Sequence, residues 1–266
     1  MDWTPTRVAL LVASAFCAGA VNSIAGGGSL LTFPALLGAG LDPLTANATS
    51  TVALVPGSMS AAWSYRAHLR GQSRAIVIMA IPSFVGGLLG AMLLLRAGSS
   101  TFTKLVPWLL LGATGLFASQ ELLARRRAAR EGEAIEPERE PTLGAGSVAA
   151  LVVVQCVVAL YGGYFGAGIG IAMLAALSLV GMREIHRMNA LKNLAAAVIN
   201  GIGVVLFLRA GAAELPVAGV MALAAVAGGR SGARLAQRVS PVTVRRGVTA
   251  VGLAITAYLF AKSLLR

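Results

Sequence analysis

The chain has 266 residues, of which 57% are hydrophobic and only 12% charged. A soluble domain has about 45–50% apolar and about 25% charged residues. The composition therefore excludes an ordinary soluble protein and indicates an integral membrane protein, in agreement with a mean hydropathy of +0.79. The net charge of +12 does not indicate a nucleic-acid partner, because the basic residues lie in short loops between apolar runs, as expected of cytoplasmic loops.

Ten hydrophobic segments follow one another, five on each side of a polar stretch. In chain order they span 7–24, 27–41, 44–66, 74–96 and 102–123 in the first half, and 143–162, 165–181, 185–208, 214–234 and 243–263 in the second. Most approach the roughly 20 residues that an α-helix needs to cross about 30 Å of hydrocarbon, but the second segment of each half is shorter. The sequence therefore predicts an all-α polytopic membrane protein, with a first transmembrane repeat at 1–124 and a second at 143–266.

The stretch 125–142 between the halves has mixed charge, two prolines and few apolar residues. Such a composition favours a flexible linker without a core of its own, and its arginines favour the cytoplasmic side of the membrane. The two cysteines, Cys17 and Cys156, both lie inside apolar segments, so no disulfide framework is expected.

The second half repeats features of the first at a distance of 142 residues. At this shift, seven small, hydroxyl or basic residues recur: Gly86, Gly87, Gly90, Ala91, Arg96, Thr101 and Lys104 fall on Gly228, Gly229, Gly232, Ala233, Arg238, Thr243 and Arg246. Asn47 and Ala48 likewise fall on Asn189 and Ala190. The chain is therefore predicted to contain two copies of one helical unit. For the recurring glycines, close helix packing is an alternative to any role in binding.

The charge of the loops indicates that the two copies face opposite sides of the membrane. A basic loop with Arg66, Arg70 and Arg74 follows the third segment of the first half, whereas Arg183 and Arg187 precede the third segment of the second half. Basic loops favour the cytoplasm. All of the basic loops lie on the cytoplasmic side only if each half crosses the membrane an odd number of times. We therefore expect an inverted repeat of five segments per half, with the linker in the cytoplasm and both chain ends outside. Whether the short second segment of each half crosses completely stays open.

Glycine-rich stretches interrupt the chain where the first segment of each half ends. They comprise Gly26, Gly27 and Gly28, flanked by Asn22, Ser23 and Ser29, and, in the second half, Gly166, Gly168 and Gly170, preceded by Tyr161 and Tyr164. Glycine lets the chain turn inside the membrane, and the helix that follows begins with free N–H groups. Two such helix starts facing one volume favour an anion, and interrupted helices form the binding sites of many secondary transporters. The tyrosines either line this volume or anchor the chain at the membrane interface.

The third segment of each half carries a polar cluster: Asn47, Thr49, Ser50 and Thr51 in the first, and Asn189, Lys192, Asn193 and Asn200 in the second. Polar side chains are costly in lipid unless helix partners, water or a ligand satisfy them. We interpret both clusters as substrate contacts, with Lys192 about 12 Å deep and paired to an anion between Asn189, Asn193 and the first glycine stretch. The alternatives are hydroxyls bonded to a carbonyl one turn back, and a lysine that extends back to the headgroups. His68 and His186 lie in basic loops and are expected to be solvated.

The pattern AGGGSLLTFPALLGAGLDPLTANATSTVALVPGS, repeated weakly as GAGIGIAMLAALSLVGMREIHRMNALKNLAAAVINGIG, resembles the sulfite exporter TauE/SafE family, also called the 4-toluene sulfonate uptake permeases. The resemblance covers nearly the whole chain. It implies a multi-pass transporter of the bacterial or archaeal inner membrane that moves small anions, often sulfur-containing oxyanions or organosulfonates such as sulfite or sulfoacetate. One departure is that NALKN stands at 189–193 where the first half has NATST at 47–51.

Two other classes of function were weighed against an anion transporter. A membrane enzyme is disfavoured because the apolar segments lack paired carboxylates, a metal-ligand cluster or a Ser-His arrangement, so neither a metal nor another cofactor is expected. A structural or sensory membrane subunit without transport activity is the alternative that we retain. The expected partners are a small anion and the lipid bilayer, without nucleic acid, and a homo-oligomer is compatible with the sequence.

Overall fold

The computed structural model describes residues 4–24, 27–131, 144–182, 184–235 and 241–264. These residues form helices and contain no strand. In chain order the helices are α1 (Pro5–Ile24), α2 (Ser29–Gly38), α3 (Pro43–Ser64), the 3₁₀ helix η1 (Arg66–Leu69), α4 (Ser73–Glu131), α5 (Ala145–Tyr164), α6 (Ile169–Leu179), α7 (Ile185–Arg209), α8 (Leu215–Leu235) and α9 (Pro241–Leu264). The predicted all-α fold is confirmed.

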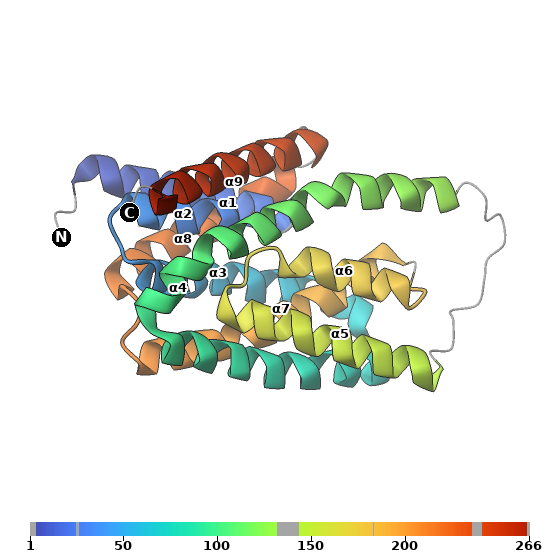
Figure 1. The fold of residues 1–266 in the computed structure, drawn as a ribbon. Coiled ribbons are helices and arrows are strands. Elements are labelled where there is room, and N and C mark those ends of the chain that lie inside the picture. Colours follow the sequence, from blue (N-terminus) through green and yellow to red (C-terminus); the bar gives the residue numbers. More distant parts are fainter. Residues whose placement is uncertain (1–3, 25–26, 132–143, 183, 236–240, 265–266) are drawn as a thin grey trace.

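The fourth and fifth predicted segments are joined in one helix, α4, which is kinked at Gly98. Gly98 has a φ of 69°, a conformation that glycine adopts without strain, and it divides α4 into a first arm (73–97) and a second arm (99–131). Both arms lie along the bundle and run in opposite directions (Figure 1). The kink at Gly98 therefore lies where the sequence predicts a loop between the fourth and fifth segments.

Several helices are long and apolar enough to cross a membrane. Within the described residues, spans that satisfy both criteria lie in α1, α4, α5 and α7. The apolar helices α2 and α6 have 10 and 11 residues, which at 1.5 Å per residue is about 15 Å, half of the roughly 30 Å of hydrocarbon. The protein is a multi-pass membrane protein in which the short second helix of each half is too short to cross alone.

Helices that are equivalent in the two halves pack in antiparallel fashion. The backbone N–H of Glu214, beyond the end of α7, donates to Oγ1 of Thr49 near the start of α3 at 3.0 Å. At the other end of the pair, His68 of η1, which follows α3, stacks on His186 at the start of α7. Because the start of one helix meets the end of the other, α3 and α7 run in opposite directions, as Figure 1 also shows.

The second arm of α4 and α9 are a further equivalent pair with the same geometry. The rings of Trp108 and Phe260 lie 4.9 Å apart, and a Cβ placed on Gly252 would lie 2.5 Å from Oγ1 of Thr114. Trp108 precedes Thr114 in α4, but its partner Phe260 follows Gly252 in α9, so this pair is antiparallel as well. Two pairs of equivalents therefore have the relation expected if one half is inverted with respect to the other.

Glycines allow close contact in two further matched helix pairs, α5 with the first arm of α4, and α1 with α8. A Cβ on Gly90 would overlap the carbonyl oxygen of Leu160, and one on Gly228 would overlap that of Phe16. Gly86 meets Cys156 and Gly90 meets Leu160, so the residue numbers rise together along the two helices. The first arm of α4 and α5 are therefore parallel. These glycines serve helix packing, the alternative role considered for them from the sequence.

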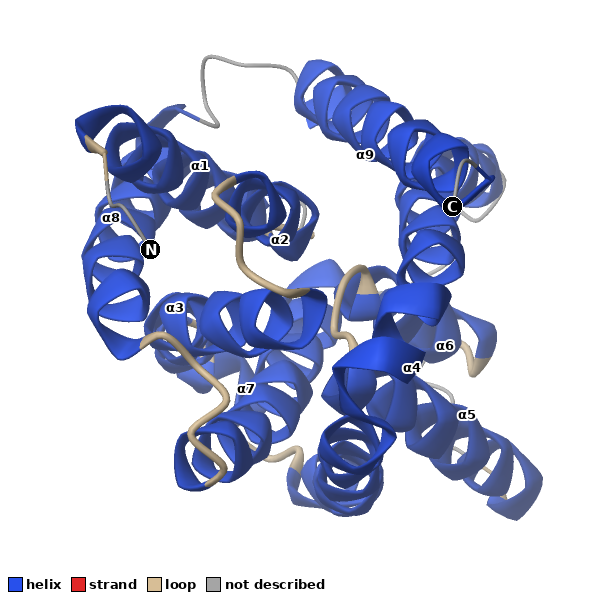
Figure 2. Cartoon of the chain, turned by 60° about the vertical axis from the view of Figure 1, so that its left-hand side comes forward, coloured by secondary structure: helices blue, strands red, loops and turns tan. Residues whose placement is uncertain are grey.

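The bundle has distinct ends and sides. α1 begins and α9 ends at one end of the bundle, whereas α4 ends and α5 begins at the opposite end (Figure 1). Viewed from another direction, α3 and α7 lie next to each other, with α1, α2 and α8 on one side and α4, α5 and α6 on the other (Figure 2). This places the helices of both halves around one central pair.

Labelling of single cysteines tests the predicted orientation, in a variant in which Cys17 and Cys156 are replaced by alanine. A cysteine at Gly71 and one at Gly132, which lies outside the described residues, should react only with a reagent on the cytoplasmic side. A cysteine at Gly98 should react only from outside. Outside labelling at Gly132 would contradict the inverted arrangement.

A valine at Gly90 should strongly lower the thermal unfolding midpoint, since its Cβ has no room against Leu160. Gly115→Val provides the control on the second arm of the same helix, where an added Cβ meets nothing within 4 Å. Thermal unfolding of both purified variants measures the difference. Equal midpoints for the two variants would show that the α4–α5 contact is not a close glycine contact.

Candidate functional site

The second break, which we define as residues Tyr164–Gly170, separates α5 from α6. The N–H groups of Phe165 and Gly166 both donate to the carbonyl of Tyr161, at 2.8 and 3.2 Å, and end α5. Gly166 and Gly168 have φ values of 81° and 80°, a conformation that is costly for residues with a Cβ. Glycine at these positions thus lets the chain reverse so that the first N–H groups of α6, which lack partners within the helix, lie next to the end of α5.

Polar side chains from both halves meet the second break. Asn47 of α3 is buried and donates from Nδ2 to the carbonyl of Tyr164 at 3.3 Å. On α7, Cδ of Lys192 lies 3.3 Å from the position of a Cβ on Gly170, and Oδ1 of Asn200 lies 3.9 Å from that of a Cβ on Gly166. The amide groups of Asn47 and Asn200 and the stem of Lys192 therefore lie next to the break.

Lys192 is the positive charge of this site. Its side chain is half-buried, and Nζ donates to Oδ1 of Asn189 at 3.0 Å. In the part of the chain that the structure describes, this neutral amide is the hydrogen-bond partner of the ammonium, and no carboxylate forms an ion pair with it. A charged side chain within the bilayer costs about 2.5–3.5 kcal/mol even on the most permissive scale. Lys192 is thus a positive group whose charge is not balanced by the described residues.

The contacts of Lys192 differ from our interpretation of the sequence in one respect. We expected Lys192 to face the glycine stretch of the first half, but the glycine that its stem contacts is Gly170, in the second break. The stem of Lys192 lies against Gly170 at the contact between α6 and α7. A larger residue at position 170 would push the lysine side chain aside. Asn193, the next predicted site residue, is half-buried on α7.

Two polar contacts are described at and beside the first break, between α1 and α2. Oδ1 of Asn22 accepts from the N–H of Gly28 at 2.8 Å. The hydroxyl groups of Thr32 and Ser50 are 2.6 Å apart and buried. Gly27 has a φ of 88°, so this stretch is also a glycine turn. We place the candidate anion site at the second break, because the described residues hold an ammonium group beside it.

Three predicted site residues of the first break have no described contact to report. Gly26 lies outside the described residues. Ser23 belongs to α1, but its side chain is not described, and Ser29 is the half-buried first residue of α2. Gly28 is buried against α1, since a Cβ there would lie 2.6 Å from the carbonyl oxygen of Ala18.

The hydroxyl groups of three other predicted residues have partners within the protein, and that of a fourth has none among the described residues. Thr51 donates to the carbonyl of Asn47 one turn back at 2.9 Å, the structural alternative for this hydroxyl. Thr49 accepts from Glu214, as described above. Tyr161 donates to the carbonyl of Leu109 at 3.4 Å. The hydroxyl of Tyr164 is buried and has no hydrogen-bond partner among the described residues.

An aromatic cluster adjoins the second break, and sequence reasoning missed it. Phe33 of α2 packs edge-on against Phe165 with ring centroids 5.2 Å apart. Phe102, from the second arm of α4, packs on Tyr164 at 5.5 Å and on Phe165 at 6.1 Å. These rings come from both halves and close one side of the break to water. No local sequence pattern indicates them, because Phe33, Phe102 and Phe165 are far apart in the chain.

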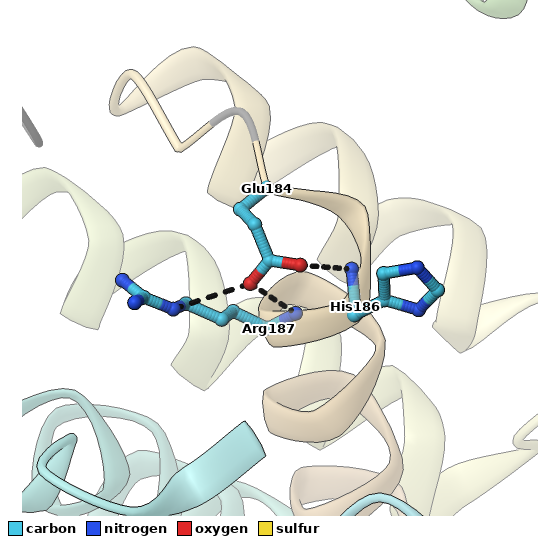
Figure 3. A network of polar contacts seen from close by, with 3 residues as sticks. All are labelled: Glu184, His186 and Arg187. Atoms are coloured by element: carbon cyan, nitrogen blue, oxygen red, sulfur yellow. Dashed lines mark hydrogen bonds and ion pairs between the residues drawn. The ribbon is translucent and has the colours of Figure 1, made fainter. Parts of the chain in front are cut away.

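Acidic residues cap the N-termini of α3 and α7, the helices that carry the polar clusters. The sequence analysis did not predict these caps. Glu184 accepts from the N–H groups of His186 and Arg187 at 3.1 Å each, and pairs with Nε of Arg187 at 3.2 Å (Figure 3). Asp42 caps α3 through the N–H of Leu44 at 3.1 Å. Burial raises the pKa of Asp42, but hydrogen bonds, chiefly from Thr45 and Ser99, outweigh it, so that the pKa lies below its ordinary value. The sequence did contain one indication of these caps, because Asp42 and Glu184 are 142 residues apart, which is the distance of the predicted repeat.

An apolar pocket lies elsewhere, between α1 and α8. Its lining residues are Val8, Leu11, Pro216, Val217, Val220 and Met221. None of these side chains donates a hydrogen bond, so the pocket is not suited to an anion. The second break, with Lys192, is therefore the better candidate for a substrate site.

The helical fold and the broken helices define an all-α polytopic membrane protein of the kind found among transporters. The chain belongs to the sulfite exporter TauE/SafE family, whose model matches residues 11–259. It is 28% identical to a "probable membrane transporter protein" of Haemophilus influenzae, with 97% of this chain and 96% of the relative covered. It is 30% identical to the "probable membrane transporter protein YfcA" of Escherichia coli, with 98% and 92% covered. No solved structure matches the chain.

These names agree with the transporter class and not with an enzyme. A more local similarity, 36% identity over 104 residues, connects 39% of the chain with 40% of the "probable membrane transporter protein ORF9" of a Sinorhizobium species. The family assignment predicted from the glycine and asparagine motifs is confirmed.

Gly168→Ala should reduce transport per folded molecule far more than Gly98→Ala. Both glycines have positive φ values, 80° and 69°, and an added Cβ meets no atom closer than 3.4 Å at either position. The backbone strain is therefore similar, of order 1 kcal/mol, and only Gly168 adjoins the candidate site. Flux in vesicles, normalised to folded protein, measures the effect. Equal losses in the two variants would show that the glycine of the second break has no role beyond the turn.

Proposed function

We propose that the protein is a secondary transporter of the inner membrane for small anions, with sulfur-containing oxyanions or organosulfonates such as sulfite or sulfoacetate as its substrates. One observation carries this proposal. Lys192 holds a positive charge at the second break, and its described partner is the neutral amide of Asn189. A small anion at this place offsets the cost of keeping the ammonium inside the membrane.

The surroundings of Lys192 favour an oxyanion. The start of α6 carries a partial positive charge, which stabilises negative charge nearby. Asn47 and Asn200 place amide groups next to the same break, and the amide of Asn189 lies beside the ammonium of Lys192. Sulfite and sulfonate groups carry several acceptor oxygens around one centre, so they match donors that approach from α3, α6 and α7.

The arrangement of the halves supports transport through alternating access. Inverted repeats that meet at a site near the bilayer centre are common in secondary transporters, and the antiparallel pairs α3–α7 and α4–α9 are compatible with such an inversion. The family description, sulfite exporter, adds support for the substrate class. The sequence contains no nucleotide-binding loop, so the energy is expected to come from a gradient or from the substrate itself.

Flux measurements in reconstituted vesicles test the proposal. Purified protein should move at least one of sulfite, sulfate, sulfoacetate and small carboxylates in a saturable manner. Lys192→Met should abolish this flux or raise the apparent KM at least tenfold, because it removes the charge but keeps a stem of similar length. Lys192→Arg should keep part of the activity.

Lys104→Met provides the matched control, since Lys104 is an exposed lysine on the second arm of α4. It should leave the flux unchanged. If the Lys192→Met protein transports like the wild type at equal protein level, the lysine is an interfacial anchor. If the folded wild-type protein moves none of these anions, the structural or sensory subunit is the better interpretation.

A further inference from the structure

Four aromatic rings from three separate parts of the chain meet at the second break. We define the aromatic cluster as Phe33 of α2, Phe102 of the second arm of α4, and Tyr164 and Phe165 of the break. Phe102 contacts the other three rings, at centroid distances of 6.5 Å to Phe33, 5.5 Å to Tyr164 and 6.1 Å to Phe165. All four side chains are buried. The cluster is a packed apolar barrier between the two halves, with Phe102 at its centre.

The aromatic cluster lies toward the end of the bundle at which α4 is kinked. A Cβ on Gly90 would lie 2.8 Å from the backbone nitrogen of Tyr164, so these two residues are at one level of the bundle. From Gly90 the first arm of α4 continues for eight residues to the kink at Gly98, and Phe102 lies four residues back along the second arm. At 1.5 Å per residue, Phe102 is therefore about 6 Å closer to the kink than Tyr164 is.

The charged part of the candidate site lies on the other side of the break. On α7, Asn200 lies near Gly166, whereas Lys192 lies against Gly170. Lys192 is eight residues, or about 12 Å, closer to the start of α7 than Asn200 is. α7 begins at the end of the bundle opposite to the kink (Figure 1). The break therefore lies between Lys192 on one side and the aromatic cluster on the other.

The phenylalanine rings of the cluster block an anion. They donate no hydrogen bonds, and a charge placed among apolar groups without donors or a counter-charge is very costly. Buried leucine and valine side chains, among them Leu94, Val106 and Leu110, continue the same apolar core around the rings. An anion at the second break can leave toward the kink only if Phe102 separates from Tyr164 and Phe165.

The predicted repeat has no second cluster of this kind. At the 142-residue shift, its four positions correspond to residues without an aromatic ring, namely Ala175, Val244, Asn22 and Ser23. In an inverted repeat these counterparts lie toward the opposite face of the membrane. The sequence thus predicts aromatic closure on one side of the site only.

We propose that the aromatic cluster is a gate between the candidate site and the membrane face at the kink, which is the outer face in the predicted orientation. The structure shows this gate closed. Alternating access requires a site that is closed to one side while it opens to the other, and this gate opens when the second arm of α4 carries Phe102 away from the rings of the break. The role of the gate in transport rests on the proposed function, but its opening is measured without any substrate.

The accessibility of a cysteine in the site tests the gate. Asn200→Cys places a thiol near Gly166, in a parent variant in which Cys17 and Cys156 are replaced by alanine. A membrane-impermeant maleimide added from the kink side should label this thiol slowly. Phe102→Leu removes three ring contacts but keeps an apolar side chain, so it should raise the labelling rate about tenfold. A tenfold change corresponds to about 1.4 kcal/mol in the equilibrium between the closed and open gate.

Two further variants separate a gate from simple core packing. Phe33→Leu removes the ring that α2 contributes and should also raise the rate, and it replaces Phe102→Leu if that variant does not fold. Trp108→Leu is the control, since it removes a ring pair with Phe260 on the same arm outside the cluster. It should leave the rate unchanged. A cysteine at the exposed Ser100, next to the kink, shows from which face the kink side is reached.

The proposal would be overturned by an unchanged labelling rate in folded Phe102→Leu or Phe33→Leu protein, or by an equal increase in Trp108→Leu. Either result would leave the aromatic cluster as part of the core. Neither result would bear on anion transport, which the flux of the Lys192 variants tests separately. Conversely, a protein that moves none of the anions tested could still show the predicted change in labelling.

Discussion

A backbone that breaks inside a membrane must find partners for its N–H and C=O groups within the protein, and the rest of the structure depends on this constraint. Lipid offers no hydrogen bonds, and each unsatisfied group costs several kcal/mol. The chain breaks twice, at residues 25–28 and at Tyr164–Gly170. Asn22 satisfies the N–H of Gly28 at the first break, and Asn47 satisfies the carbonyl of Tyr164 at the second. Two amide side chains in the apolar helices, those of Asn22 and Asn47, are thus explained first by the broken backbone.

The two breaks differ in their contacts, although they fall at matching places of the predicted repeat. At the 142-residue shift, Ser50 corresponds to Lys192 and Gly28 to Gly170. In the first half the hydroxyl of Ser50 is paired with that of Thr32, whereas in the second half the stem of Lys192 lies against Gly170 and its ammonium donates to the neutral amide of Asn189. Replacing a hydroxyl by an ammonium at one of two related places turns a closed polar contact into a positively charged one. The candidate anion site that we propose is therefore asymmetric between the two halves.

Much of the fold could be predicted from the sequence, because the bilayer sets the length of apolar segments and glycine marks their interruptions. The predicted segments 27–41 and 165–181 correspond to α2 and α6, and the predicted loop near residue 98 is the kink of α4. The partners of polar side chains were harder to predict, since they depend on packing between distant segments. The sequence could not show that Thr51 bonds to its own helix, that Asn47 reaches Tyr164, or that Lys192 contacts Gly170. The aromatic cluster of Phe33, Phe102 and Phe165 was missed for the same reason. The inverted orientation in the membrane stays a prediction, supported by antiparallel contacts between equivalent helices.

The central claim is that an anion binds at the second break and balances the charge of Lys192. The most direct test is the thermal unfolding of purified protein in lipid nanodiscs as sulfite is added at constant ionic strength, with chloride as the replaced anion. A ligand that binds the folded state stabilises it by about 2.7 kcal/mol at 100 times its Kd. The account predicts that sulfite or another small sulfur oxyanion raises the unfolding midpoint of the wild-type protein and of Lys104→Met, and that Lys192→Met loses this rise. An equal rise in Lys192→Met and the wild type would show that the anion binds elsewhere and would contradict the account.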